Sequence, residues 1–244
     1  MRRFEDRRVV VTGAGSGIGR ELVSILLDEG ARVVGVDKDP AGVPAGAVTV
    51  VADLAAPDQV AGAMQEAMAA LSAVDVLCNN AGVGSTKSVV DCSVEEWDHL
   101  FAVNARAVFL TTQAVIPQMV SRRSGVIVNT ASAAGIVGLK DRAAYCASKG
   151  AVLALTRQVA VQYAEYGVRC LSVCPGTVDS PWLERLLAEA PDPEARRQEL
   201  VARQPLGRLA SPTEIARAIA YAASDDAAFM TGSELVIDGG ILAG

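Results

Sequence analysis

The sequence predicts an α/β fold built on a parallel sheet, and three observations lead to this prediction. Short apolar runs rich in Val and Ile alternate along the 244 residues with segments of helical period. A glycine cluster at residues 13–19 lies where the first apolar run meets the first helical segment. Small or polar residues follow several later runs, at the edge where open parallel sheets bind ligands.

The first apolar run, residues 9–12, reads as a buried strand that passes into a helix through the glycine cluster GAGSGIG. Glycines lack Cβ atoms, so the backbone can turn tightly there. A phosphate can then approach the free N–H groups and positive dipole of the helix N-terminus. We therefore expect a dinucleotide-binding turn. Its candidate cofactor contacts are Gly13, Gly15, Ser16, Gly17, Ile18 and Gly19.

The second predicted strand, residues 31–36, follows Gly30 and completes a β-α-β unit that ends at Asp37. A carboxylate at this position can accept hydrogen bonds from the ribose hydroxyls of an adenosine, and it repels a 2′-phosphate. Asp37 therefore predicts NAD rather than NADP as the cofactor. The neighbouring Lys38 is a cation that would soften this discrimination.

Two further strands continue the alternation. Residues 48–52 lead to Asp53 and Leu54, and residues 74–78 lead to the tetrapeptide NNAG at residues 79–82. Between them, Pro57 opens a helix that runs to about residue 71. The residues after these strands belong to the ligand-binding edge of the predicted sheet.

Ser132, Tyr145 and Lys149 form the candidate catalytic group. Residues 125–129 read as another buried strand, and Ser132 follows it. Tyr145 and Lys149 lie four residues apart in a segment of helical period, so their Cβ atoms should be about 5–6 Å apart. A free phenol has a pKa of about 10, and a nearby ammonium lowers that pKa. Tyr145 could then act as a general acid/base, with Ser132 hydrogen-bonded to the reacting oxygen.

The regular alternation stops after the strand at residues 168–173. Four prolines punctuate a charged, leucine-bearing segment from about residue 180 to residue 206. Long irregular segments inside compact domains are usually functional. Ser211, Pro212 and Glu214 then give a capped helix start, and residues 234–237 form the last strand.

Composition excludes several classes of function. A net charge of −6 disfavours a nucleic-acid binder. No uninterrupted apolar stretch reaches about 18 residues, so we expect no membrane-spanning helix. The charged N-terminus lacks the apolar core of a signal peptide. The five cysteines form no C-x-x-C pair, so we expect them to be reduced thiols of a cytoplasmic protein. We expect no metal site, because no cluster of His and Cys has the spacing of metal ligands. We expect no hydrolase triad, because the chain has one histidine and no G-x-S-x-G motif surrounds Ser132.

Taken together, these motifs resemble those of the short-chain dehydrogenase/reductase family, in its form of roughly 250 residues, over essentially the whole chain. The resemblance implies a single Rossmann-type, doubly wound domain at residues 1–244, with a seven-stranded parallel sheet and helices on both faces, often assembled as a homotetramer. It implies an oxidoreductase that interconverts a secondary alcohol and a ketone by hydride transfer. The motifs are Thr12-Gly13-x-x-x-Gly17-x-Gly19, Asp53, Asn79-Asn80-Ala81-Gly82, Asn104, Ser132, Tyr145-x-x-x-Lys149 and Pro175-Gly176.

The resemblance also assigns roles to individual residues. Ser132 would orient the substrate oxygen and Tyr145 would transfer its proton. Lys149 would lower the Tyr145 pKa and bind the nicotinamide ribose, and Asn104 would support a water in a proton relay. Ser180 stands where the family usually has Thr and keeps the hydroxyl. The remaining implied cofactor contacts are Asp53 near the adenine, Leu54, Asn80 near the adenosine ribose, Ala81, Gly82, Pro175, Gly176, and Val178 with Ser180 at the nicotinamide carboxamide.

In this family the segment that corresponds to residues 180–206 is a mobile substrate lid. Around it lie Arg142, Arg185 and Arg203. This context resembles the cytosolic, type 2 class of 3-hydroxybutyrate dehydrogenases, in which similarly placed arginines face the substrate carboxylate. We therefore expect a small hydroxy acid, such as 3-hydroxybutyrate or a deoxy sugar acid. The alternative is that these arginines are solvated and do not face a substrate.

Three other functions stay open. A 3-oxoacyl-carrier-protein reductase is disfavoured by Asp37, because that reaction usually draws on NADPH. A polyol or secondary alcohol dehydrogenase would use the same catalytic residues on a neutral substrate. A dinucleotide-sensing regulator without catalysis would be expected to have lost Tyr145 or Lys149, and this chain has both.

Overall fold

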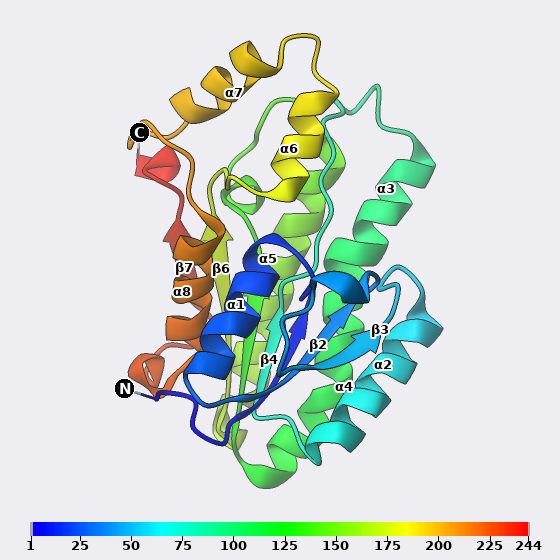
Figure 1. The fold of residues 1–244 in the computed structure, drawn as a ribbon, viewed down its shortest axis with the longest axis vertical. Helices are drawn as coiled ribbons and strands as arrows, with labels where there is room; N and C mark the ends of the chain where they lie inside the picture. Colours follow the sequence, from blue (N-terminus) through cyan, green and yellow to red (C-terminus); the bar gives the residue numbers. More distant parts are fainter. Residues whose placement is uncertain (1, 244) are drawn as a thin grey trace.

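The computed structural model describes residues 2–243, and within them seven strands form one parallel sheet (Figure 1). The strand order is β3-β2-β1-β4-β5-β6-β7, so the winding direction reverses between β1 and β4. This confirms the predicted Rossmann-type doubly wound fold. The strands are β1 (Arg8–Thr12), β2 (Arg32–Asp37), β3 (Val48–Val51), β4 (Val76–Asn79), β5 (Gly125–Thr130), β6 (Val168–Pro175) and β7 (Glu234–Ile237).

Helices cover both faces of the sheet, and each face has its own apolar core. Leu22 of α1 and Ile215 of α8 pack on one face, whereas Met64 of α2, Val115 of α4 and Val159 of α5 pack on the other. The helices are α1 (Gly17–Asp28), α2 (Pro57–Leu71), α3 (Val94–Phe101), α4 (Ala107–Arg122), α5 (Ala143–Tyr163), α6 (Pro181–Ala188), α7 (Pro193–Ala202) and α8 (Pro212–Ala223). Short 3₁₀ turns are η1 (Pro40–Gly42), η3 (Ala133–Gly135), η4 (Ala164–Tyr166), η5 (Asp225–Ala227) and η6 (Ile241–Ala243).

Helices α3 and α4 are joined by a wider, π-helical turn, η2 (Ala102–Arg106), into one helical stretch. This stretch, Val94–Arg122, is long and apolar enough on average to cross a membrane, although it contains no uninterrupted apolar run of that length. However, 56% of its apolar window is buried inside the protein. Its apolar side chains therefore serve as the core of a globular domain.

The lid segment is helical rather than irregular, contrary to the sequence prediction. Pro181 and Pro193 occupy the first turns of α6 and α7, where the missing N–H needs no partner, and Ser180 and Asp192 cap these helices. The two helices share a small apolar cluster, separate from the main cores, formed by Leu183, Leu187, Leu200 and Leu209. In Figure 1 they lie together at the top of the molecule.

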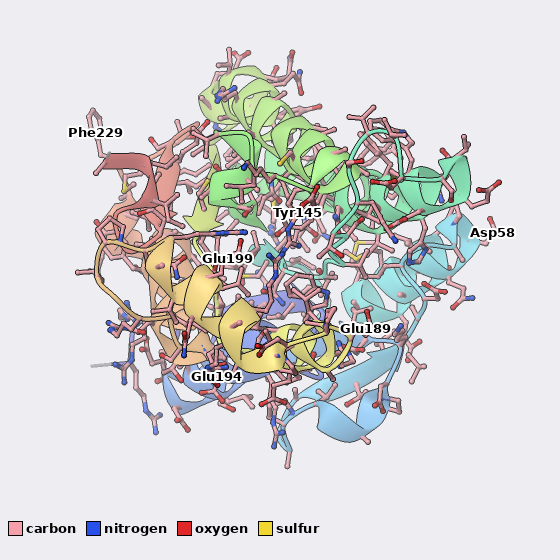
Figure 2. All side chains as sticks on the ribbon, turned by 90° about the horizontal axis from the view of Figure 1, so that it is seen from above. Asp58, Tyr145, Glu189, Glu194, Glu199 and Phe229 are labelled. Carbon is pink, nitrogen blue, oxygen red and sulfur yellow. The ribbon has the colours of Figure 1, made fainter. Side chains whose placement is uncertain are left out.

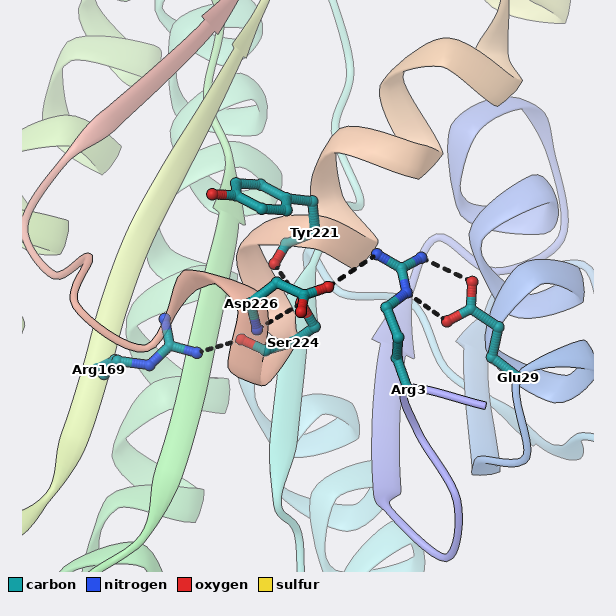
Figure 3. A network of polar contacts seen from close by, with 6 residues as sticks. All are labelled: Arg3, Glu29, Arg169, Tyr221, Ser224 and Asp226. Carbon is teal, nitrogen blue, oxygen red and sulfur yellow. Dashed lines mark hydrogen bonds and ion pairs between the residues drawn. The ribbon is translucent and has the colours of Figure 1, made fainter. Parts of the chain in front are cut away.

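Polar side chains form a network of contacts at the end of the molecule opposite α6 and α7 (Figure 3). Arg3 pairs with Glu29 at 2.6 Å and lies 4.0 Å from Asp226. Arg169 donates to the carbonyl oxygen of Ser224 at 2.9 Å, just past the end of α8. The Arg169 contact satisfies a backbone carbonyl that the end of α8 leaves without an intrahelical partner.

Candidate active site

A cleft opens at the carboxyl ends of the strands, beneath the lid helices, with about 1020 Å³ of empty volume that is partly open to solvent. Seen from above in Figure 2, Tyr145 lies near the centre of the molecule, beside the lid segment that carries Glu189, Glu194 and Glu199. The lining residues are Ile18, Asn80, Gly82, Val83, Gly84, Thr130, Ala131, Ser132, Ala133, Leu139, Arg142, Tyr145, Lys149, Pro175, Gly176, Thr177, Val178, Ser180, Trp182, Arg203 and Ile241.

The glycine turn beside this cleft leaves no room for a side chain at Gly13, Gly15 or Gly19. Gly13 and Gly17 have φ angles of +68° and +49°, a region that favours glycine. A Cβ added to Gly19 would lie 1.9 Å from the Gly13 carbonyl oxygen, and one added to Gly15 would lie 2.8 Å from the Asp39 carbonyl oxygen. Since the backbone is bare where α1 begins, the turn fits the pyrophosphate of a dinucleotide.

Asn80 anchors this turn to the end of β4. Its Nδ2 donates to the carbonyl oxygens of Thr12 at 3.2 Å and Gly13 at 3.3 Å. The Thr12 hydroxyl oxygen accepts from the backbone N–H groups of Asn80 and Ala81, both at 3.1 Å. The turn and the NNAG tetrapeptide are therefore one rigid unit.

The two acidic residues proposed for the adenosine end lie after β2 and β3. Asp37 Oδ2 accepts from the Gly15 N–H at 2.8 Å, which places the carboxylate directly beside the glycine turn. Asp53 is exposed and caps a turn by accepting from the Ala55 N–H at 2.9 Å, and Leu54 beside it is buried. Both carboxylates lie at the ligand-binding edge of the sheet.

Ser132 and Tyr145 both line the cleft. Ser132 is 8% exposed, and its hydroxyl oxygen accepts from the Ala134 N–H at 3.2 Å. Burial raises the pKa of Tyr145, while Ser132 and the positive charge of Arg142 oppose that rise. The spacing of Tyr145 and Lys149 predicted a lowered pKa, and the direction differs because desolvation outweighs the nearby positive charge.

Lys149 lies on the same face of α5 as Tyr145, with its Nζ 5.9 Å from the centre of the Tyr145 ring. The ammonium donates to the Thr130 carbonyl oxygen at 2.8 Å. Burial lowers the pKa of Lys149 to about 8. The hydrogen bond to Thr130 thus holds the Lys149 ammonium at the end of β5, 5.9 Å from the centre of the Tyr145 ring.

Asn104 is fully buried in the π-helical turn, the kind of helix distortion that often marks a functional site. Its Oδ1 accepts from the Val83 N–H at 2.8 Å, and its Nδ2 donates to the Val83 carbonyl at 2.9 Å and to the Ser148 hydroxyl at 3.0 Å. Asn104 therefore fixes the loop after β4 against α5. Residues 102–106 carry no recognisable sequence signal for this turn.

Of the three arginines named from the sequence, Arg142 and Arg203 line the cleft, whereas Arg185 is exposed on α6. Arg142 is 7% exposed, and its NH1 donates to the Ser85 carbonyl oxygen at 2.9 Å. Burial lowers the pKa of Arg142, and the positive charge of Arg203 lowers it further. Arg203 pairs with Glu199 at 2.7 Å. The structure thus brings two of the three arginines together.

Trp182 and Gly84 line the cleft but were not identified from the sequence. The one sequence signal for Trp182 was the rarity of its residue type, since the chain has two tryptophans and only 4% aromatic residues. Ser180, two residues before Trp182, accepts from the Leu183 N–H and so caps α6. In the part of the chain that the structure describes, no group of three or more His, Cys, Asp or Glu side chains could hold a metal ion.

Comparison with known proteins identifies the family. A family model described as "Enoyl-(Acyl carrier protein) reductase" matches residues 13–242. Dehydrogenase/reductase SDR family member 6 of Danio rerio is 39% identical over 98% of this chain and 99% of its own length. The chain belongs to the short-chain dehydrogenase/reductase family. Like other members, it is an oxidoreductase that uses a nicotinamide dinucleotide and acts on small molecules.

Two further relatives illustrate the range of this family. The 2-keto-3-deoxy-L-fuconate dehydrogenase of Xanthomonas campestris is 38% identical over 98% of this chain and 81% of its own length. The solved structure of Thermoplasma acidophilum aldohexose dehydrogenase matches with a TM-score of 0.91 and 33% identity, over 98% of this chain and 95% of that chain. One name indicates a sugar acid and the other a neutral sugar.

Proposed function

We propose that this protein is an NAD-dependent dehydrogenase that interconverts the secondary alcohol of a small hydroxy acid and the corresponding ketone. The observation that carries the proposal is one cleft lined both by the candidate acid/base Tyr145 with Ser132 and by two arginines, Arg142 and Arg203. The substrate would resemble 3-hydroxybutyrate or a deoxy sugar acid. A relative named for 2-keto-3-deoxy-L-fuconate supports an acid of this size.

The proposed cofactor contacts follow from the bare backbone of the glycine turn. When bound, a nicotinamide dinucleotide would supply the hydride acceptor for alcohol oxidation and the hydride donor for ketone reduction. Asp37 favours NAD, because its carboxylate can accept hydrogen bonds from ribose hydroxyls and repels a 2′-phosphate. Val178 and Ser180 would hold the nicotinamide carboxamide, and Asp53 would lie near the adenine.

The proposed proton chemistry uses the catalytic residues as follows. During oxidation the alcohol proton passes to the Tyr145 oxygen, and during reduction it returns to the substrate. Ser132 would hold the same substrate oxygen by a hydrogen bond. Lys149 would bind the nicotinamide ribose and favour the phenolate when it is charged. Asn104, which already fixes the Val83 backbone, would support a water in the proton relay.

The proposed anion site rests on the donors of Arg142 and Arg203. A guanidinium carries five N–H donors in a planar fork, so Arg142 keeps donors for a ligand after it has bound the Ser85 carbonyl. Its burial strengthens an ion pair with a carboxylate, because the local dielectric is low. Arg185 is left out of this proposal because it is exposed on α6.

We also propose that α6 and α7 act as the substrate lid and that the protein works as a cytoplasmic homotetramer. The support for assembly is apolar surface: Phe109 of α4 and Val161 of α5 are exposed, as is Val236 of β7. Phe229 is fully exposed and projects from the surface in Figure 2. Exposed apolar patches commonly mark interfaces between chains.

The proposal is tested with a panel of hydroxy acids, matched neutral alcohols, polyols and an acyl-carrier-protein substrate, each with NAD(H) and NADP(H). Arg142→Ala should lower kcat/KM for the acid by roughly 10- to 150-fold, the effect of losing one charged hydrogen-bond partner. It should affect the neutral alcohol much less. Arg185→Ala is the matched control, because that arginine is exposed on the lid and should change kcat/KM little.

Three results would overturn the proposal. Equal use of the acid and the neutral alcohol by the unmodified enzyme would remove the anion site. NADPH-dependent activity confined to the acyl-carrier substrate would replace the hydroxy acid with a fatty acyl group. A Tyr145→Phe enzyme with ordinary turnover would remove the acid/base assignment, since only the phenol hydroxyl is lost.

A further inference from the structure

The Arg142 guanidinium lies between the candidate acid/base and the lid. The Arg142 guanidinium carbon is 5.8 Å from the centre of the Tyr145 ring and 5.3 Å from the centre of the Trp182 ring. Both separations are within the range of a cation–π interaction. Tyr145 belongs to α5, which packs on the sheet, whereas Trp182 is the second residue of the lid helix α6.

The third contact of Arg142 is with the loop after β4. Its NH1 donates to the Ser85 carbonyl oxygen at 2.9 Å, and the Ser85 hydroxyl in turn donates to Glu96 of α3. Two of the three contacts that hold the guanidinium therefore come from the body of the domain. The contact with Trp182 is the one that comes from the lid.

Gly84 provides the space that the Trp182 ring occupies. A Cβ added to Gly84 would lie 2.2 Å from Cζ2 of Trp182 and 2.8 Å from its Cε2. Such a Cβ would therefore force the ring off the backbone. The glycine and the tryptophan are complementary, although they lie far apart in the sequence.

We propose that Trp182 is a positioning residue, which holds Arg142 against the Tyr145 ring when α6 lies over the cleft. Closing the lid would then adjust the acid/base group as well as cover the substrate. This inference rests on the proposed function in one respect, namely that Tyr145 is the acid/base. Arg142 acts here on the tyrosine, which is separate from its contact with the substrate carboxylate.

The charge on Arg142 affects the tyrosine directly. Burial raises the pKa of Tyr145, and the positive charge of Arg142 counteracts that rise. At an effective dielectric constant of about 20, moving a unit charge from about 6 to about 8 Å raises the pKa of a phenol by roughly half a unit. The other charged or titratable groups around this pair are Cys146 and Lys149 on α5, Cys174 on β6 beside Lys149, Arg196 on α7, and Arg203 directly after α7.

The test measures the Tyr145 titration in three variants. The phenolate absorbance of each protein with NADH bound is followed against pH, and the signal of the same protein carrying Tyr145→Phe is subtracted. Trp182→Ala should raise the apparent pKa by about half a unit or more. Trp182→Phe should bring the apparent pKa of Tyr145 most of the way back to that of the unmodified protein. Gly84→Ala should reproduce the upward shift while Trp182 is still present.

Two controls separate this effect from general damage. Trp97→Ala removes the other tryptophan, which stacks on Phe101 at 4.7 Å in α3. Leu186→Ala disturbs the packing of the lid cluster. Both should leave the Tyr145 titration unchanged. The ascending limb of the kcat profile for alcohol oxidation, along which Tyr145 loses its proton and becomes the base, should move with the titration in the Trp182 and Gly84 variants.

Coincident titrations for Trp182→Ala and the unmodified protein would overturn the inference. So would an equal shift in Leu186→Ala, because lid packing in general would then set the pKa. The titration needs no turnover, so it decides the inference separately from the proposed function. An active Tyr145→Phe enzyme would overturn the acid/base role on which both proposals depend, whereas the titration would still show whether Trp182 positions Arg142 against Tyr145.

Discussion

The glycine turn and the lid meet at one cleft, but they are fixed in place by different means. A Cβ added to Gly17 would lie 3.7 Å from the Ser180 Cβ, so the two regions are neighbours. The turn is held by the backbone, which is too crowded at Gly19 to admit a side chain. The lid helices share their own leucine cluster and are tied down by an exposed ion pair between Arg197 and Asp179. One region is a rigid cradle, and the other is a unit with its own small core.

The largest expected effect is on the rigid side of this comparison. Gly19→Ala would place a Cβ 1.9 Å from the Gly13 carbonyl oxygen, so the turn must rearrange. We expect NADH affinity to fall by roughly a hundredfold or more, which corresponds to about 3 kcal/mol. Fluorescence titration with NADH measures this loss.

Gly62→Ala is the matched control, because a Cβ at this position of α2 would meet open space among the described residues. It should leave NADH affinity unchanged and stabilise the helix by about 0.5–1 kcal/mol. Normal cofactor binding by Gly19→Ala would mean that the turn is less rigid than its contacts indicate.

The second prediction compares two leucines of nearly equal burial. Leu22 of α1 is 0% exposed and Leu200 of α7 is 1% exposed. Leu22→Ala should lower the free energy of global unfolding by about 2–5 kcal/mol, because it opens a cavity in the main core. Leu200→Ala should instead accelerate amide hydrogen exchange within α6 and α7, because the lid can open locally.

Denaturant unfolding and hydrogen-exchange mass spectrometry distinguish these outcomes. The contrast between cradle and lid would disappear if Leu200→Ala accelerated exchange in β1 and α1 as much as in the lid. The Leu22→Ala variant serves as the reference for a change in the main core.

The smallest expected effect concerns cofactor choice. Asp37→Ala should narrow the preference for NAD over NADP by about tenfold, because a charged hydrogen-bond acceptor is removed. The exposed Lys38 is the comparison, and Lys38→Ala should widen the preference because a cation near the 2′-position is lost. The kcat/KM ratio for the two cofactors measures both effects. Equal efficiency with NAD and NADP in the unmodified enzyme would contradict the assignment of Asp37.

The cradle could be predicted from the sequence because its causes are local. The strand, glycine turn and helix are consecutive, and the helical spacing between Tyr145 and Lys149 places them on one face. The helices of the lid were missed because Pro181 and Pro193 were interpreted as breaks, although proline fits the first turn of a helix. Local pattern also could not show that Arg185 would be exposed.

The electrostatics of the site were the least predictable part. The spacing between Tyr145 and Lys149 indicated a lowered phenol pKa, yet the ammonium is bound to the Thr130 carbonyl and burial dominates. The contact between Trp182 and Gly84 joins distant parts of the chain, so only the folded structure reveals it. Tertiary contacts of this kind leave no periodic trace in a single sequence.

Because of the π-helical turn at Ala102–Arg106, the geometry of the site depends on the number of residues in this segment. The Ala107 N–H donates to the Ala102 carbonyl oxygen five residues back, so the turn holds one residue more than an α-helical turn. Deleting one residue would restore a regular helix and rotate α3 relative to α4 by about 100°. Leu100 would then leave its buried position, and the Asn104 amide would turn away from Val83. No substitution could compensate, because chain length rather than side-chain chemistry sets the angular position of Asn104.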